Sequence, residues 1–384
     1  MKYAVIVVGY NRQKPMKRLL DSLCNAVYYN PCDLIISLDY SKSQSDLLNI
    51  AKEVKWKHGE KKIRAFQTNQ GLRPHILQCG DLTEEYDAVI VLEDDLIVAK
   101  GFFQYVTETV EFYGDNPKIA GISLYAYRSN QGNGRPFEAQ FNGYDVFLMQ
   151  FAQSWGQCWT KQMWQAFRSW YKEQTNISAD GIIPDYVIRW DDRSWLKYYI
   201  RYTAEKGLYF VYPYFSLTTN NSECGEHHSK TNNAYQVPLS EGNIHNYRLP
   251  SIENAVKYDP FFERIYGDKV NQKYGGKVCL DLYGLKRFYG DANILISTNL
   301  LNYKIISKIG LNYRPHELNC MLPEKGNDIF VYDLREKEKN TSKSNQLQIV
   351  TYDVRAEWPR MTFMHGICGL WQGLRNKMHK KLRK

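Results

Sequence analysis

Residues 88–98 join a buried-strand pattern to three consecutive carboxylates. Residues 88–92 are apolar, Glu93, Asp94 and Asp95 follow directly, and apolar sequence resumes at Leu96. A short β-branched run predicts a strand buried on both faces. Three adjacent negative charges repel one another unless a cation neutralises them, and carboxylate oxygens suit Mg²⁺ or Mn²⁺, which can bridge to nucleotide phosphates. The alternative is an acidic turn exposed to solvent, the commoner role of a short charge run.

Three more polar residues follow apolar runs in the first hundred positions: Arg12, Asp39 and Arg73. We expect strands at 3–8, 33–38, 62–67 and 88–92, with helices around 16–23 and 43–56 and another after a loop at 69–75. Later in the chain we expect an aromatic-rich strand at 208–217, followed by a polar loop from Thr218. Strands that alternate with helices predict a mostly parallel sheet. Because such sheets bind ligands beyond the carboxyl ends of their strands, the three residues and the acidic triplet should meet in one crevice. We interpret this crevice as a nucleotide site.

Two common nucleotide-binding motifs are absent. The first strand is not followed by G-x-G-x-x-G, and G-x-x-x-x-G-K-[ST] occurs nowhere. This disfavours a dinucleotide-dependent oxidoreductase and a P-loop enzyme. Phosphate would then be held by a metal and arginine, an arrangement that suits a nucleoside diphosphate leaving group.

Composition narrows the class of protein further. The chain has 384 residues, 30 Tyr and 9 Trp, so it can bury a large core, and some aromatic rings could pack against sugars. The eight cysteines are scattered without a C-x-x-C pair, which argues against a zinc site. We expect neither a signal peptide nor a membrane-spanning helix, and therefore a cytoplasmic protein.

The net charge of +9 is concentrated at the end of the chain. Six basic residues lie within the last ten positions: Arg375, Lys377, Lys380, Lys381, Arg383 and Lys384. Together with the apolar residues just before it, this tail could rest on the anionic inner face of the cytoplasmic membrane. A solvated chain end is an equally good interpretation. No nucleic-acid partner is expected, because the basic residues are not interleaved with stacking aromatics.

Four segments together resemble the GT-A fold of nucleotide-sugar-dependent glycosyltransferases. They are Val-Ile-Val-Val-Gly-Tyr-Asn-Arg at 5–12, Leu-Glu-Asp-Asp-Leu-Ile-Val-Ala at 92–99, Ser-Trp-Gly-Gln-Cys-Trp-Thr from 154, and Trp-Asp-Asp-Arg-Ser-Trp at 190–195. The resemblance covers residues 3–230. Within it, the segments are similar to those of family 2 bacterial polysaccharide glycosyltransferases and of the N-acetylglucosaminyltransferase I type. It implies an α/β fold with a catalytic domain at 1–235 and an accessory or acceptor region at 236–384.

The resemblance also implies roles for individual residues. Asp95 would coordinate Mn²⁺ or Mg²⁺ on the diphosphate, while Glu93 and Asp94 would contact the sugar and ribose. The other positions that match nucleotide-sugar-binding residues are Arg12 and Asp39 for the base, Arg73 near the diphosphate, Trp155, and His228 in a Gly-x-His-like loop.

Asp191 matches the general base of inverting enzymes, with Asp192 as its neighbour and second choice. A carboxylate can take the proton of an acceptor hydroxyl as that hydroxyl attacks C1, and one base without a covalent nucleophile gives inversion. The alternative is that Asp191 and Asp192 cap the helix that includes Trp195.

The implied function is an inverting, metal-dependent hexosyltransferase. It would move a sugar from a nucleotide-sugar, most simply a UDP-sugar, to a bacterial surface glycan such as capsule or lipopolysaccharide, or to a lipid-linked oligosaccharide. Two alternatives remain: a nucleotidyltransferase that makes sugar nucleotides, and a noncatalytic carbohydrate-binding or membrane-binding protein.

Overall fold

The computed structural model describes residues 1–221, 223, 233–242, 246–341, 346–354, 366–367 and 371. The chain divides into two compact units. Unit 1 comprises Met1–Gly267 with Leu285–Tyr289, and unit 2 comprises Asp268–Gly284 with Gly290–Lys384. No described helix has the length and apolar character needed to cross a bilayer.

Unit 1 is built on a nine-stranded sheet in the order β11-β7-β9-β6-β8-β4-β1-β2-β3. Its strands are β1 (Tyr3–Gly9), β2 (Cys32–Leu38), β3 (Lys61–Ala65), β4 (Ala88–Glu93), β6 (Ile119–Ser123), β7 (Val146–Met149), β8 (Gln157–Thr160), β9 (Tyr209–Pro213) and β11 (Lys257–Tyr258). Strands β1 to β4 pair in parallel, whereas β8 runs antiparallel to both of its neighbours. A two-stranded ribbon, β5 (Leu96–Val98) with β10 (Thr218–Asn220), lies outside this sheet.

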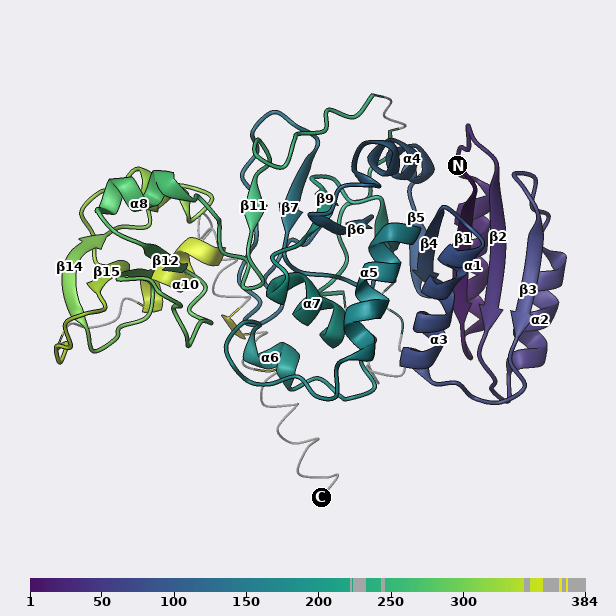
Figure 1. Ribbon diagram of the computed structural model, residues 1–384, viewed down its shortest axis with the longest axis horizontal. Helices are drawn as coiled ribbons and strands as arrows, with labels where there is room; N and C mark the ends of the chain where they lie inside the picture. Colours follow the sequence, from purple (N-terminus) through teal and green to yellow (C-terminus); the bar gives the residue numbers. More distant parts are fainter. Residues whose placement is uncertain are drawn as a thin grey trace, which may run out of the picture. The chain divides into compact units, whose positions relative to one another are not determined.

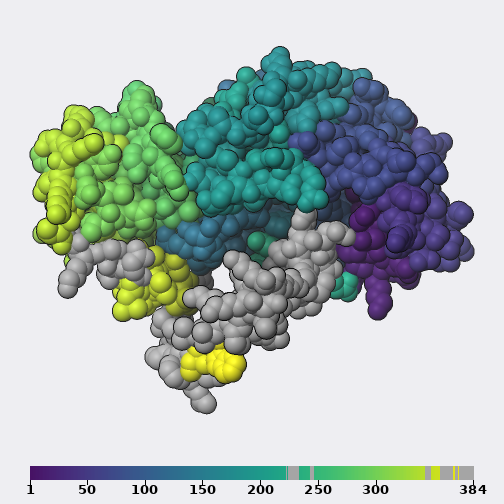
Figure 2. Space-filling view, turned by 90° about the horizontal axis from the view of Figure 1, so that it is seen from below, coloured from purple at the N-terminus to yellow at the C-terminus, as the bar shows by residue number. Residues whose placement is uncertain are grey.

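Helices cover both faces of the sheet in unit 1 (Figure 1). One face packs against α1 (Gln13–Cys24), α2 (Gln44–Glu53) and α4 (Phe102–Tyr113) in a continuous apolar core. The other face carries α3 (Leu72–Gly80), η1 (Asp81–Glu84), α5 (Lys161–Lys172) and α7 (Trp195–Glu205), and the single turn α6 (Asp185–Ile188) precedes α7. In space-filling form, the purple and blue atoms of the earlier elements lie against the teal atoms of the later ones (Figure 2).

The predicted α/β class, with a mostly parallel sheet flanked by helices, is confirmed, and two local expectations are wrong. The loop predicted at 69–75 ends at Gly71, because α3 starts at Leu72 and a proline is tolerated in the first turn of a helix. The strand predicted at 208–217 ends at Pro213, and Thr218–Asn220 forms β10 instead of a loop because it pairs with β5.

The boundary between the units lies later than the predicted 235/236. Strand β11 pairs in parallel with β7 and so extends the large sheet, and the chain up to Gly267 belongs to unit 1. The roles of the two regions stay a prediction.

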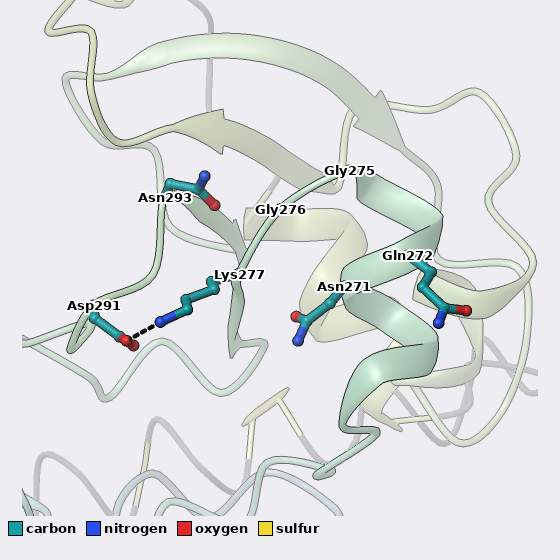
Figure 3. A pocket seen from close by; sticks show the side chains of 7 residues that line it. All are labelled: Asn271, Gln272, Gly275, Gly276, Lys277, Asp291 and Asn293. Atoms are coloured by element: carbon teal, nitrogen blue, oxygen red, sulfur yellow. Dashed lines mark hydrogen bonds and ion pairs between the residues drawn. The ribbon is translucent and has the colours of Figure 1, made fainter.

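Unit 2 holds a four-stranded sheet in the order β12-β13-β15-β14. Its elements are α8 (Asp268–Tyr274), β12 (Val278–Asp281), β13 (Ile294–Ser297), β14 (Lys304–Ile309), α9 (Leu318–Met321), β15 (Ile329–Asp333) and α10 (Gln346–Val354). An open pocket of about 670 Å³ lies where α8 meets β12 and is lined by seven residues: Asn271, Gln272, Gly275, Gly276, Lys277, Asp291 and Asn293 (Figure 3). None of these is a predicted site residue.

Candidate functional site

The acidic triplet lies where β4 ends and the chain turns into β5. Residues 88–92 are almost fully buried, and Glu93, the last residue of β4, is paired with Val8 of the parallel strand β1. Asp94 and Asp95 form the turn that follows. The carboxyl end of a central parallel strand therefore presents three carboxylates together, as the sequence predicts.

Arg12 neutralises part of this charge. It lies just beyond β1, where it donates hydrogen bonds to Asp94 Oδ1 and, at 3.3 Å, to Asp95 Oδ2. The Asp94 side chain is only 5% exposed, whereas Arg12 and Asp95 are 22% and 23% exposed. A carboxylate this buried needs a close countercharge, because a charge in a low-dielectric interior is costly when unpaired. The predicted convergence of Arg12 with the triplet is therefore observed.

Burial and mutual repulsion weaken the acidity of two of the three carboxylates. Burial, followed by the charges of Asp95 and Asp94, raises the pKa of Glu93 to about 8. Burial also raises the pKa of Asp94 to about 6, against the lowering effect of Arg12. Perturbed carboxylates at the end of a parallel strand are typical of functional sites.

Asp95 is the carboxylate best suited to hold a metal. Its Oδ1 is buried and has no hydrogen-bond partner among the described residues, while its Oδ2 accepts from Arg12. Within those same residues, no group of three or more His, Cys, Asp or Glu side chains could hold a metal ion. Mg²⁺ and Mn²⁺ sites that act on nucleotides often use one or two carboxylates with phosphate and water as the remaining ligands, and Asp95 fits such a site.

Asp39 organises the loop that leads into α3. Its carboxylate accepts hydrogen bonds from the backbone N–H groups of Tyr40, Gln70 and Gly71 at 2.7 to 3.0 Å and from the Asn69 amide at 3.3 Å. The residue is only 4% exposed. Asp39 thus shapes this edge of the sheet through the loop, and its contact with a base stays a prediction.

Arg73 lies in the first turn of α3 and faces α7. Its guanidinium is 5.3 Å from the ring centre of Tyr198, a cation–π contact that joins the early turns of the two helices. We did not anticipate Tyr198 from the sequence, where it is one of many tyrosines on an amphipathic helix. No described contact joins Arg73 to the triplet.

Trp155 lies beside the end of β4. Thr218 Oγ1 donates to its carbonyl oxygen at 2.5 Å, and its ring packs between Tyr125 and Tyr235 at centroid distances of 4.8 and 4.9 Å. Gly156 follows with φ +94°, and a Cβ there would lie 2.8 Å from Thr218. The positive φ and the close threonine explain why glycine stands at this position.

The segment with Asp191 and Asp192 precedes α7. Asp191 forms an ion pair with Arg193 at 2.8 Å, and Asp192 lies 3.4 Å from the Lys197 ammonium. The capping alternative is wrong, because Ser194 is the N-cap and its side chain accepts from Lys197 N. The catalytic role of Asp191 and Asp192 stays a prediction. His228 lies outside the described residues.

Comparison with known families gives one match. Residues 4–173 match the model described as Glycosyl transferase family 2. This segment runs from β1 to the end of α5 and includes Arg12, Asp39 and the triplet. The family 2 part of the predicted resemblance is therefore confirmed there, whereas the closer likeness to the N-acetylglucosaminyltransferase I type is not shown. No curated protein matches the chain.

Several solved structures are similar to parts of the chain. S. aureus TarS 1-349 in complex with UDP-GlcNAc has 14% identity and a TM-score of 0.40, covering 59% of this chain and 60% of its own. Mouse xyloside xylosyltransferase 1 in its apo form has 11% identity and a TM-score of 0.37, covering 55% of this chain and 84% of its own. The mannosyltransferase PcManGT from Pyrobaculum calidifontis, in complex with GDP-Man and Mn²⁺, has 11% identity and a TM-score of 0.29, covering 42% and 44%.

Proposed function

We propose that unit 1 is an inverting, metal-dependent glycosyltransferase of the hexosyltransferase type that uses a nucleotide-sugar, with UDP as the nucleotide to test first. One observation carries the proposal. Arg12 and the acidic triplet form a partly buried ionic cluster at the carboxyl end of β4, and Asp95 keeps one buried oxygen without a described partner. The family 2 match of residues 4–173, which contain this cluster, gives independent support.

The carboxylates and Arg12 would bind the polar parts of the donor. Asp95 would hold Mn²⁺ or Mg²⁺, which when bound neutralises negative charge on the diphosphate. Glu93 and Asp94 would contact the sugar and ribose, and the Asp39 loop with Arg12 would border the base.

Asp191 would act as the general base. Its carboxylate would take the proton of the acceptor hydroxyl during attack on C1, from the face opposite the departing diphosphate. The contacts of α7 support a position at this edge of the sheet, because the first turn of α7 meets that of α3 through Arg73 and Tyr198. Arg193 would have to release Asp191 for this step, or hold its carboxylate in place.

Acceptor and location complete the proposal. The acceptor would be a hydroxyl of a bacterial surface glycan or of a lipid-linked oligosaccharide, and unit 2 would contribute to its selection. The basic C-terminal tail, which lies outside the described residues, would attach the protein to anionic lipid at the inner face of the membrane.

The deciding experiment measures UDP release from a panel of UDP-sugars with and without Mn²⁺, in wild type and Asp95→Ala. Release that needs the metal and is lost in the variant supports the proposal and excludes a noncatalytic binding protein. Release of pyrophosphate from UTP and a sugar 1-phosphate would instead identify a nucleotidyltransferase. Full activity without metal or without Asp95 would contradict the proposal.

A further inference from the structure

Gln157 is a buried amide whose oxygen makes no hydrogen bond in the described structure. It is the first residue of β8, it is only 1% exposed, and its Oε1 has no partner among the described residues. A buried polar atom without a partner costs stability, so its presence in a strand of otherwise well-packed residues needs a reason.

The register of β8 places Gln157 next to the acidic triplet. Gln157 pairs with Val91 of the antiparallel strand β4, two residues before Glu93. Because residues opposite one another share a face and alternate residues repeat it, Gln157, Val91 and Glu93 lie on one face of the sheet.

The same face is covered by α7. Trp159, two residues after Gln157, packs edge-on against Trp195, the first residue of α7, at 5.8 Å, and stacks on Tyr199 at 5.7 Å. Strand β8 runs toward the amino end of β4, so Gln157 lies nearer the carboxyl edge than Trp159 does. The segment before Trp195, with Asp191, is therefore expected at the same edge as Gln157.

A second glutamine shows how this chain treats a structural amide. Gln153 is fully buried, and its Nε2 donates to Ser123 Oγ at 2.8 Å and to the Gly156 carbonyl oxygen. Its Oε1 accepts from Trp155 N. Four residues separate a glutamine with both amide atoms in use from one whose buried oxygen is left without a partner.

We propose that the Gln157 amide binds a hydroxyl of the sugar transferred from the nucleotide-sugar, and thereby contributes to sugar specificity. This inference rests on the proposed function and deepens it. A sugar hydroxyl can donate a hydrogen bond to the Gln157 side-chain carbonyl oxygen. In a nucleotide-sugar, the sugar is the part that extends past the diphosphate.

The first test needs no ligand. In the metal-free full chain, Gln157→Leu should unfold at the same or a higher denaturant concentration than wild type, because a leucine of similar volume replaces an amide whose buried oxygen has no partner. Gln153→Leu is the matched control and should unfold at a clearly lower concentration, since it breaks three hydrogen bonds. A loss in Gln157→Leu as large as that in Gln153→Leu would overturn the inference.

The second test measures binding of UDP and of UDP-glucose, UDP-galactose and UDP-N-acetylglucosamine to the full chain with Mn²⁺ by calorimetry. For the UDP-sugar that wild type binds best, Gln157→Leu should weaken binding by about tenfold or more, because a buried sugar hydroxyl then lacks its hydrogen-bond partner. The affinity for UDP should stay unchanged. Equal loss for UDP and the UDP-sugar, or no loss for either, would overturn the inference. Failure of the proposed function looks different, because wild type itself would then bind none of these ligands.

Discussion

Arg12 and Asp95 are 83 positions apart in the sequence, yet Arg12 Nη1 lies 3.3 Å from Asp95 Oδ2. The pair joins the turn after β1 to the turn after β4, and the parallel pairing of these two strands brings it together. In the metal-free protein the guanidinium supplies the countercharge of the triplet. A divalent cation at Asp95 would add to this charge and favour an incoming diphosphate.

Asp95→Asn should remove metal-dependent donor binding while leaving the fold intact. Asp95 is partly exposed, and the asparagine that replaces it has a polar side chain of the same shape. We expect UDP affinity with Mn²⁺ to fall to the level that wild type shows without metal, a change measurable by calorimetry. Unfolding curves serve as the control and should nearly coincide. A variant that still responds to Mn²⁺ like wild type would place the metal elsewhere.

Glu93→Gln should change how stability depends on pH. Burial and the neighbouring charges raise the pKa of Glu93 from its ordinary 4.5 to about 8, so between these values the native state holds a proton that the unfolded chain has lost. The contribution of Glu93 to the free energy of unfolding is therefore fully present below pH 4.5 and is lost as pH rises through about 8.

The measurement is the free energy of unfolding by urea, without metal, at about pH 5 and about pH 8. Wild type should lose more stability across this range than Glu93→Gln, whose neutral amide mimics the protonated acid. Asp94, with its pKa raised to about 6, adds a smaller fall in both proteins. Identical slopes in the two proteins would show that Glu93 titrates normally.

Asp39→Ala should destabilise unit 1 through its loop. The substitution leaves the backbone N–H groups of Gln70 and Gly71 without their acceptor, which we expect to lower the free energy of unfolding by about 2 to 4 kcal/mol. Asp39→Asn keeps one acceptor oxygen and should lose less. Denaturant unfolding gives both values, and an alanine variant as stable as wild type would contradict this role.

Asp191→Asn and Asp192→Asn form a matched pair that tests the general base. If Asp191 takes the acceptor proton, its variant should lower kcat by about 10² to 10⁴ with little change in donor affinity. Asp192 is 94% exposed and lies 3.4 Å from the Lys197 ammonium, so its variant should retain most activity. Steady-state kinetics with a transferring donor and acceptor separates the two. The reverse order of effects would assign the base to Asp192.

Much of the fold could be predicted from local pattern. The apolar runs that become β1, β2 and β4 are short and bounded by polar turns, and the helices between them repeat apolar residues with helical spacing. Such patterns are local, because a strand buried on both faces needs only a continuous apolar run and a helix needs only one apolar face. The start of α3 was missed because it depends on the loop that Asp39 holds. The strand at Thr218–Asn220 was missed because it depends on pairing with β5.

The amino-acid sequence by itself determined that carboxylates follow a buried strand, because hydrophobic run length and charge are local properties. Only the tertiary structure decided that Arg12 is the cation that meets these carboxylates, and that Gln157 is buried opposite Val91 of β4 with its oxygen left without a partner. The physical reason is that a hydrogen-bond partner or a countercharge comes from segments tens of residues away. Strand order and register, which no single segment encodes, select that partner.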